Sequence, residues 1–471
     1  MIIHTIKSGD TLWKIAAQYR VSTSSIIELN ELSNPDQIVI GQALVIPTED
    51  IYHTVRPGET LWSIAQAYGI TIQAILQYNQ IANPASINPG ILLYIPAARH
   101  RVQPGETLWQ IAQRYGVSQQ TLMKINNIKN PNLIYPGNEL MLPTKYRPVI
   151  YVNGYIYFFG EQAVPIVREV GEHLTYLSPF AYRIREDGDL ETIDDLPAVK
   201  TAYTMSVVPL MSITNFTSTE LGENLSHAVL SNLQIVERLL ANIIKTMNQK
   251  GYRGLIIDFE NVLPADRENY NRFLQLAVDR LHPHGFVVAS ALAPKTSAGQ
   301  SGLLYEAHDY AAHGRILDFV VLMTYEWGYR LGPPRAISPI DQIRNVLDYA
   351  VTVIPRNKIY FGFQIYARDW LLPHVQGQEA ETFSNREAIE RAVRHGAVIQ
   401  YDKVAEAPFY RYKDSRGRMH EVWFEDARSA QAKFDTTKAY GLKGISYWTL
   451  GYPYPENWAL LEDNFTIRKL I

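Results

Sequence analysis

The pattern of hydrophobic and polar positions divides the chain into two regions with different periods. In the first third, short apolar stretches with helical spacing recur every 47–49 residues. From Val149 onward, continuous apolar runs of strand length alternate with longer helical stretches. The pattern therefore predicts an array of small repeated modules followed by a region with a parallel sheet.

Each repeat begins with the same five-residue pattern of glycine, acid, threonine, leucine and tryptophan. The copies are Gly9-Asp10-Thr11-Leu12-Trp13, Gly58-Glu59-Thr60-Leu61-Trp62 and Gly105-Glu106-Thr107-Leu108-Trp109. The acid and the threonine are suited to cap a helix, and the residues that follow form an apolar helical face. We therefore expect the three tryptophans in the cores of their modules.

The rest of each repeat contains a tyrosine, a second helix ending in asparagine, an Asn-Pro step and a closing strand. These features are Tyr19, Tyr68 and Tyr115; Asn30, Asn79 and Asn126; Asn34-Pro35, Asn83-Pro84 and Asn130-Pro131; and Pro47, Pro96 and Pro143. The order predicts three strand–helix–helix–strand (βααβ) modules at residues 1–48, 51–97 and 99–144, with a junction near Tyr146-Arg147-Pro148.

Eight apolar runs in the second region predict the strands of a (β/α)8 barrel, an α/β fold, over residues 148–471. They are Val149–Tyr157, Leu174–Tyr182, Val207–Ile213, Gly254–Glu260, Phe286–Ala293, Leu317–Tyr325, Lys358–Ile365 and Gly444–Thr449. Helices are expected between them, for example over Leu225–Lys250 and Arg267–Leu281. The interval after strand seven is too long for one helix and predicts a small α+β insertion at about 370–440 that walls the active site.

The most informative candidate chemistry lies at the end of the fourth predicted strand. Gly254 to Ile257 is a buried-strand pattern, and Asp258 and Glu260 follow it two residues apart. Alternation along the strand places both carboxylates on one side. Two acids on an apolar strand cannot both be comfortably charged, so one is expected to keep its proton near neutral pH, as a general acid must.

Composition and charge narrow the function classes. The formal net charge of -3 gives no reason to expect nucleic acid or an anionic membrane as partner. There is no cysteine, so disulfides and thiolate metal sites are excluded. The pair His282 and His284 has no carboxylate at metal-ligand spacing. We expect a monomer without metal or cofactor, without a transmembrane helix and without a signal peptide.

All three repeats resemble the LysM module. The resemblance implies binding to glycans that contain N-acetylglucosamine, such as peptidoglycan or chitin, in a groove between the first strand–helix loop and the last helix–strand loop. The implied glycan-binding residues are Gly9, Asp10, Thr11, Gly58, Glu59, Thr60, Gly105, Glu106 and Thr107. Three weak sites in tandem would give avidity on a polymer.

The barrel region resembles glycoside hydrolase family 18 along nearly its whole length. The matching segments are Asp258-Phe259-Glu260, Met323-Thr324-Tyr325-Glu326, Ser178-Pro179-Phe180-Ala181-Tyr182 and Tyr447-Trp448-Thr449-Leu450-Gly451. Two acids of the usual Asp-Gly-x-Asp-x-Asp-x-Glu motif are replaced here, by Arg253 and Ile256. The catalytic Glu260 is retained, so the departure does not exclude activity.

The family resemblance implies substrate-assisted hydrolysis. Glu260 would protonate the glycosidic oxygen, and Asp258 would orient the substrate's acetamido group as it attacks the anomeric carbon. Tyr325 would donate to the acetamido oxygen, and Trp448 would form the floor under the sugar. Further substrate-binding residues are expected to be Met323, Glu326, Tyr182 and Tyr366.

The combined architecture resembles the LysM-bearing spore-cortex lytic N-acetylglucosaminidases of endospore-forming bacteria. It implies synthesis in the mother cell, location at the coat–cortex boundary, and cleavage of the β-1,4 bond after N-acetylglucosamine, with retention, during germination. One alternative is a LysM-bearing chitinase. The other is an inactive glycan-binding spore coat protein, motivated by Arg253 and Ile256.

Overall fold

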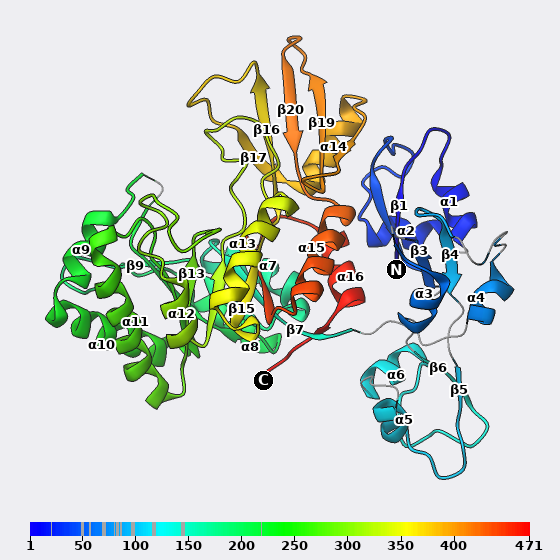
Figure 1. The fold of residues 1–471 in the computed structure, drawn as a ribbon, viewed down its shortest axis with the longest axis horizontal. Helices are drawn as coiled ribbons and strands as arrows, with labels where there is room; N and C mark the ends of the chain where they lie inside the picture. The colour runs from blue at the N-terminus through cyan, green and yellow to red at the C-terminus, as the bar shows by residue number, and fades with distance from the viewer. Residues whose placement is uncertain are drawn as a thin grey trace. The chain divides into compact units, whose positions relative to one another are not determined.

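The computed structural model divides into two compact units, Met1–Asp36 with Leu44–Pro148, and Gln37–Ala43 with Val149–Ile471 (Figure 1). It describes residues 1–19, 21–48, 51–55, 58–67, 72–79, 81, 84, 87–95, 99–114, 119–142, 147–217 and 219–471. Several predicted positions lie outside the described residues: Tyr68, Asn83, Pro96, Tyr115, Pro143, Tyr146 and the predicted module limits at 97 and 144.

Each N-terminal module consists of a two-stranded sheet and two short helices in βααβ order, as predicted. The first contains β1 (Ile2–Thr5), α1 (Leu12–Tyr19), α2 (Thr23–Leu29) and β2 (Ala43–Ile46). The second contains β3 (Ile51–Thr54), α3 (Leu61–Ala67), α4 (Ile72–Tyr78) and β4 (Leu92–Ile95). The third contains β5 (Arg99–Arg101), α5 (Leu108–Arg114), α6 (Gln119–Ile125) and β6 (Glu139–Met141).

The predicted core positions of the three tryptophans are wrong. Trp13, Trp62 and Trp109 are 73%, 64% and 58% exposed. The buried stripe of α1 consists of Leu12, Ile15, Ala16 and Tyr19. These residues follow the i, i+3, i+4, i+7 spacing of one helix face, and the position directly after Leu12 lies about 100° around the helix. The apolar run is therefore longer than the face that the module can bury.

The helix-ending asparagines join the second helix of each module to its closing strand. The Asn30 amide donates to the carbonyls of Ile26 and Val45, both at 2.8 Å, and accepts the Val45 N–H at 2.7 Å. Asn79 makes the same three bonds with Ile75 and Tyr94, and Asn126 makes them with Leu122 and Met141. The repeated asparagine is thus a structural element of the module.

The second unit is a closed barrel of parallel strands, and the (β/α)8 prediction is confirmed. The barrel strands follow one another around the ring, and the second and third are each divided into two short strands. In order they are β7 (Val149–Ile156), β8 with β9 (Tyr176–Pro179, Tyr182–Arg183), β10 with β11 (Val208–Pro209, Met211–Thr214), β12 (Gly254–Asp258), β13 (Val287–Leu292), β14 (Phe319–Leu322), β15 (Ile359–Gln364) and β21 (Gly444–Trp448). β21 pairs with β7, which closes the ring. Ile256 is completely buried in a core that includes Tyr155 and Phe319.

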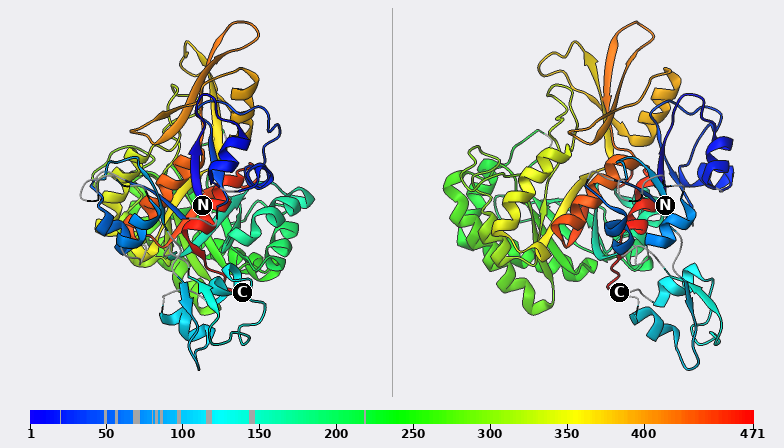
Figure 2. Two further views of the ribbon diagram at one scale, coloured as in Figure 1. Left: turned by 90° about the vertical axis from the view of Figure 1, so that its right-hand side faces the viewer. Right: turned by 45° about the vertical axis from the view of Figure 1, so that its right-hand side comes forward.

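Helices surround the barrel strands (Figure 2). They are α7 (Ala163–Val170), α8 (Leu196–Thr204), α9 (Glu223–Leu230), α10 (Leu233–Lys250), α11 (Arg267–Leu281), α12 (Tyr310–Ile316), α13 (Ile340–Val353), α15 (Ala427–Tyr440) and α16 (Pro455–Asn464); β22 (Thr466–Ile467) pairs with β7. The predicted helix Leu225–Lys250 is two helices, because the Asn232 side chain accepts the N–H groups of Gln234 and Ile235 and begins α10. Among the described residues, no helix combines the length and the apolar character needed to cross a membrane.

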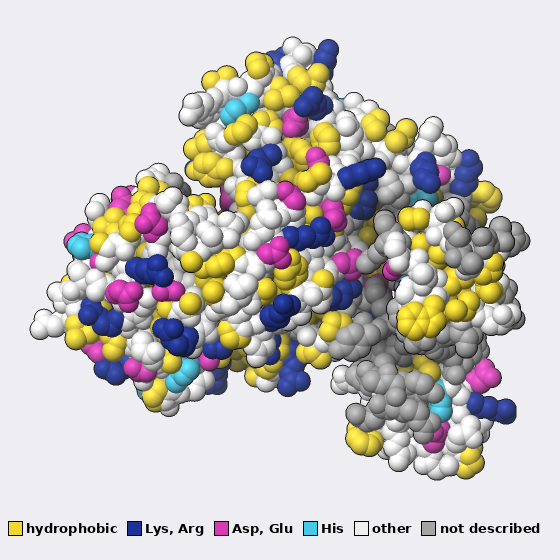
Figure 3. Space-filling model, in the orientation of Figure 1, with side chains coloured by type: hydrophobic (Ala, Val, Ile, Leu, Met, Phe, Trp, Pro, Cys, Tyr) yellow, Lys and Arg dark blue, Asp and Glu magenta, His cyan; other side chains and the backbone are white. Residues whose placement is uncertain are grey.

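The predicted insertion is a lobe with a five-stranded antiparallel sheet in the order β17-β16-β20-β19-β18, and it projects from the barrel (Figure 1). It contains β16 (Tyr366–Leu372), β17 (Glu381–Ser384), α14 (Asn385–Arg394), β18 (Gln400–Asp402), β19 (Ala407–Lys413) and β20 (Met419–Trp423). The predicted limit near residue 440 includes α15, which packs on α13 and α16 of the barrel and also contacts β19 of the lobe. On the face seen in Figure 3, acidic and basic side chains are interspersed over the second unit, which consists of the barrel and this lobe.

Candidate active site

The carboxylates of Asp258 and Glu260 face the inside of the barrel at the C-terminal end of β12. Asp258 is the last residue of the strand. Phe259, between the two acids, is completely buried and stacks on Phe273 and Tyr270 of α11, with ring centroids 5.6 and 5.8 Å apart. Because side chains alternate along an extended chain, anchoring Phe259 in the helix layer turns both carboxylates inward.

Burial controls the protonation of this acid pair. It raises the pKa of Asp258 well above its ordinary value, and the charge of Glu260 raises that pKa further. Burial and then the charge of Glu326 raise the pKa of Glu260 to about 7. Asp258 Oδ1 is buried without a hydrogen-bond partner among the described residues. Two such groups titrate as a pair, so the site can hold one proton beside one carboxylate near neutral pH.

A third carboxylate, Glu326, follows β14 and is held by side chains of β16, the first strand of the lobe. Arg368 donates to both of its oxygens at 2.8 Å, and the Tyr366 hydroxyl also donates to it. The side chains of Arg368 and Tyr366 are almost completely buried. The structure thus brings together two predicted residues, Glu326 and Tyr366, and adds a buried guanidinium that the sequence did not indicate.

Tyr325 and Met323 lie at the same barrel end. Burial raises the pKa of Tyr325 well above its ordinary value, with further contributions from Tyr155, Asp258 and other nearby groups. Its hydroxyl is therefore a neutral hydrogen-bond donor at every physiological pH. Met323 is 9% exposed, so only a small part of its side chain can reach a ligand.

Trp448 closes β21 within an aromatic group. Its ring centroid lies 4.9 Å from that of Phe180 and 5.7 Å from that of Tyr155, both edge-to-face. The Tyr157 ring lies 6.1 Å away at 36°. Trp448 remains partly exposed while these rings fix its orientation. A fixed, partly exposed indole is suited to stacking against the apolar face of a sugar.

The structure places Tyr182 in a separate buried cluster. Tyr182 is completely buried, and its hydroxyl donates to Asp195 at 2.5 Å. Asp195 also pairs with Lys250 at 2.5 Å and accepts from Tyr252. The hydroxyl of Tyr182 therefore supports the packing of the barrel rather than the group around Glu260, unlike the substrate-binding position expected from the sequence.

Two further side chains hold the backbone of the acid segment. His308 Nδ1 accepts the Ala293 N–H at 2.9 Å, so its Nε2 carries the proton and donates to the Phe259 carbonyl at 2.9 Å. The side chain of Asn215, directly after β11, accepts the N–H of Glu260 and donates to its carbonyl. Sequence reasoning missed both residues; the available signal was that polar residues directly after barrel strands gather at the active end.

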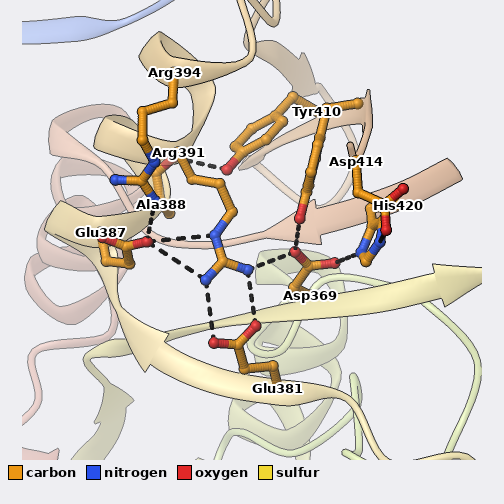
Figure 4. A network of polar contacts seen from close by, with 10 residues as sticks. Asp369, Glu381, Glu387, Ala388, Arg391, Arg394, Tyr410, Asp414 and His420 are labelled. Carbon is orange, nitrogen blue, oxygen red and sulfur yellow. Dashed lines mark hydrogen bonds and ion pairs between the residues drawn. The ribbon is translucent and has the colours of Figure 1, made fainter. Parts of the chain in front are cut away.

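The lobe fixes the strand that carries Arg368. Asp369, the next residue on β16, points to the opposite face and is 4% exposed. Its carboxylate accepts from Arg391 at 2.6 Å and from the Tyr412 hydroxyl at 2.6 Å, and lies 2.8 Å from His420 Nδ1 (Figure 4). This buried network sets the position of β16, and with it the guanidinium of Arg368 that pairs with Glu326.

The loops predicted to bind glycan in the modules have internal bonds of their own. Gly9, Gly58 and Gly105 have φ values of 85°, 85° and 83°, which favour glycine. The hydroxyls of Thr11, Thr60 and Thr107 accept the N–H three residues later at 3.2, 3.1 and 3.2 Å, and so cap the first helix as predicted.

The acids of the same motif do not cap the helix as predicted; they pair with histidines of the first strands. Asp10, Glu59 and Glu106 pair with His4, His53 and His100 of the first strands at 3.0, 2.7 and 2.6 Å. Asp10 and Glu106 also accept a backbone N–H, each at 2.8 Å. These acids brace the loop against the first strand of each module.

Comparisons with known proteins agree with both units. The model for glycosyl hydrolases family 18 matches residues 175–452, and the LysM domain model matches residues 4–47, 53–96 and 100–143. The chain is 45% identical to the cortical fragment-lytic enzyme of Bacillus subtilis (strain 168), over 100% of this chain and 99% of that protein.

Solved structures give the same result. The spore cortex-lytic enzyme SleL of Bacillus megaterium QM B1551 matches with a TM-score of 0.80 and 38% identity, over 100% of this chain and 99% of that one. A chitinase from Chromobacterium violaceum matches with a TM-score of 0.62 and 23% identity, over 67% of this chain and 98% of that one, which concerns the fold alone. The protein therefore belongs to glycosyl hydrolase family 18 and carries LysM domains in front of its hydrolase barrel.

Proposed function

We propose that this glycoside hydrolase degrades spore-cortex peptidoglycan and cleaves the β-1,4 bond after N-acetylglucosamine with retention of configuration. The observation that carries the proposal is the buried acid pair, in which the pKa of Glu260 is raised to about 7. A proton donor beside a carboxylate is what a substrate-assisted glycosidase requires. The relatives named for cortex lysis match over the whole chain, modules included.

In the first step, the protonated Glu260 gives its proton to the glycosidic oxygen as the bond to the anomeric carbon breaks. The acetamido oxygen of the same N-acetylglucosamine attacks that carbon and forms a bicyclic oxazolinium. Asp258 accepts from the acetamido N–H and offsets the developing charge, while the Tyr325 hydroxyl donates to the acetamido oxygen. Glu260, now a carboxylate, then removes a proton from water, which attacks the same carbon and regenerates the acetamido group.

This mechanism determines which glycosidic bond of the cortex glycan the enzyme cleaves. The sugar at the cleaved bond must supply a free acetamido group, whereas the muramic lactam of cortex has its nitrogen locked in a ring. The lactam therefore stands on the leaving side. The three LysM modules would hold the polymer near the barrel, and the enzyme would act in the spore during germination.

Two observations support an active enzyme over an inactive binding protein. Arg253 is exposed, and Ile256 is completely buried in the apolar barrel core. The loss of the two upstream acids therefore leaves no unpaired charge, and the side chains of Asp258 and Glu260 keep their inward positions.

The test is mass spectrometry of fragments released from spore-cortex peptidoglycan by wild type and by Glu260→Gln. Wild type should produce fragments with reducing N-acetylglucosamine, and the variant should produce none while still binding the sacculus. Muramic acid at the new reducing ends would overturn the proposed bond. Faster release from colloidal chitin than from cortex would favour a chitinase, and no release by wild type would favour a binding protein.

A further inference from the structure

The backbone of Glu260 lies beyond the sheet and is held by a side chain. β12 ends at Asp258, so the N–H and C=O of Glu260 are outside the strand ladder. The Glu260 N–H donates to Asn215 Oδ1 at 2.8 Å, and Asn215 Nδ2 donates to the Glu260 carbonyl at 2.7 Å. The primary amide thus replaces the neighbouring strand that a residue inside the sheet would have.

Asn215 is itself held in one orientation. It is completely buried, and Nδ2 also donates to the Gly222 carbonyl at 3.1 Å. Gly222 has a φ of 82°, and a Cβ there would lie 2.2 Å from the Asn215 carbonyl oxygen, so the loop packs directly on this residue. Both amide hydrogens and the amide oxygen are therefore used, and the side chain cannot rotate without losing all three bonds.

The direction of the Glu260 carboxyl group depends on this backbone. Asn261, the next residue, has a φ of 52°, so the chain turns away immediately after Glu260. The amide of Asn215 fixes the peptide groups on both sides of the Glu260 Cα, and the Cα–Cβ bond follows from them. A small rotation there moves the carboxyl group by about 1 Å, enough to change a rate by roughly a hundredfold.

We propose that Asn215 is a positioning residue that aims the Glu260 carboxyl group at the glycosidic oxygen. The inference rests on the proposed function, in which Glu260 is the proton donor. Its consequence is specific: in the first chemical step, loss of Asn215 should slow the release of only those leaving groups that need a proton. A general loss of folding would slow all substrates equally.

The probes are two aryl glycosides of di-N-acetylchitobiose, one with a phenyl and one with a dinitrophenyl leaving group. The phenolate from the phenyl glycoside is a poor leaving group and needs protonation, whereas dinitrophenolate leaves without it. Asn215→Ala should lower the single-turnover rate of phenol release by roughly ten- to a hundredfold. It should leave substrate binding and the single-turnover rate of dinitrophenolate release nearly unchanged, because this release precedes the water attack in which Glu260 acts as base.

Two variants complete the design. Asn215→Asp keeps the shape and the acceptor for the Glu260 N–H but cannot donate to the Glu260 carbonyl, and it serves if the alanine variant does not fold. It should show the same selective loss. Its new carboxylate should also move the alkaline limb of the pH profile upward. Asn224→Ala, at an exposed asparagine on α9, is the matched control and should behave as wild type.

Glu260→Gln, measured in parallel, separates the two possible failures. If Glu260→Gln slows the release of phenol and of dinitrophenolate equally in a single turnover, or wild type hydrolyses neither glycoside, the proposed function fails and the inference falls with it. If Glu260→Gln shows the selective loss while both Asn215 variants slow the two glycosides equally or not at all, Asn215 is a structural residue and only the positioning inference is overturned.

Discussion

The first LysM loop and the C-terminal end of the barrel both contain acidic residues, but the surroundings shift the pKa values of these residues in opposite directions. In the first module, the backbone N–H of Lys7 and the ring of His4 lower the pKa of Asp10. In the barrel, burial raises the pKa of both Asp258 and Glu260. The module acid is satisfied by its own loop, whereas the barrel acids are kept partly unsatisfied.

This contrast separates structural from chemical use of a carboxylate. A buried acceptor without a partner, such as Asp258 Oδ1, costs about 1–3 kcal/mol. Such a cost persists where the group is needed for a ligand or a reaction. The module acids carry no such cost, so substituting them should affect the stability of the module and leave the chemistry unchanged.

The largest expected difference is between Asp258→Asn and Asp10→Asn. The first removes the charge that offsets the oxazolinium and should lower kcat on cortex fragments by at least about a hundredfold. The second should leave kcat on short soluble fragments unchanged, because the Asp10 carboxylate bonds to Lys7 and His4 of its own module. Steady-state kinetics on the two variants decides the matter, and equal losses would contradict the assignment.

The module asparagines should have a large effect on stability and none on chemistry. Asn30→Ala removes three hydrogen bonds and takes the side-chain partner from the buried N–H and C=O of Val45, while the Ile26 carbonyl keeps the backbone N–H of residue 30. We expect the first module to open more readily by about 2–4 kcal/mol. Hydrogen exchange on the full chain measures this locally. Asn34→Ala, at an exposed asparagine of the same module, is the control; if it destabilises as much, the joining role of Asn30 is wrong.

The raised pKa of Glu260 predicts a pH-dependent stability. Its pKa moves from 4.5 to about 7 on folding, so between these values the folded state binds a proton that the unfolded state has released. Stability should therefore fall as pH rises through this window. Glu260→Gln does not titrate and should be more stable than wild type by about 1–3 kcal/mol at pH 8, with little difference at pH 4. Calorimetry of the barrel transition at both pH values tests this; a variant destabilised at pH 8 would contradict it.

Substituting Glu326 should have a smaller effect, a change in the pKa of Glu260. Its charge raises the pKa of Glu260, and Glu326→Gln also leaves the guanidinium of Arg368 without its counter-charge. Both changes favour the ionised form of Glu260. The alkaline limb of kcat/KM should therefore move to lower pH by up to about one unit. Glu379→Gln, at an exposed glutamate of the lobe, should leave the limb in place; a shift to higher pH in Glu326→Gln would reverse the assignment.

The parts of this structure that sequence could predict depend on local periodicity. Apolar runs indicated the barrel strands, and alternation at the end of one run placed Asp258 and Glu260 on one side. The bond between Arg368 and Glu326 joins residues 42 positions apart, and it depends on the direction in which the lobe leaves the barrel. No local pattern contains that direction, and the same limit applies to Asn215 and His308.

Apolar periodicity also led to a wrong prediction of which side chains are buried in the LysM modules. The run from Leu12 to Tyr19 contains more apolar residues than one helical face can bury. In a module of under 50 residues, the small core selects the stripe that faces the sheet and leaves the indole of Trp13 in water. Length of apolar sequence is therefore a weaker guide to burial in a small module than in the barrel.

The smallest predicted effect follows from that exposed indole. Trp13→Ala removes a side chain that is 73% exposed and should change the stability of the module by less than about 0.5 kcal/mol. Ile15→Ala, two residues on and 1% exposed, should cost about 2–5 kcal/mol. Hydrogen exchange of the first module in the full chain compares them directly. If the tryptophan variant costs as much as the isoleucine variant, the indole belongs to the core after all, and the stripe assigned to α1 is wrong.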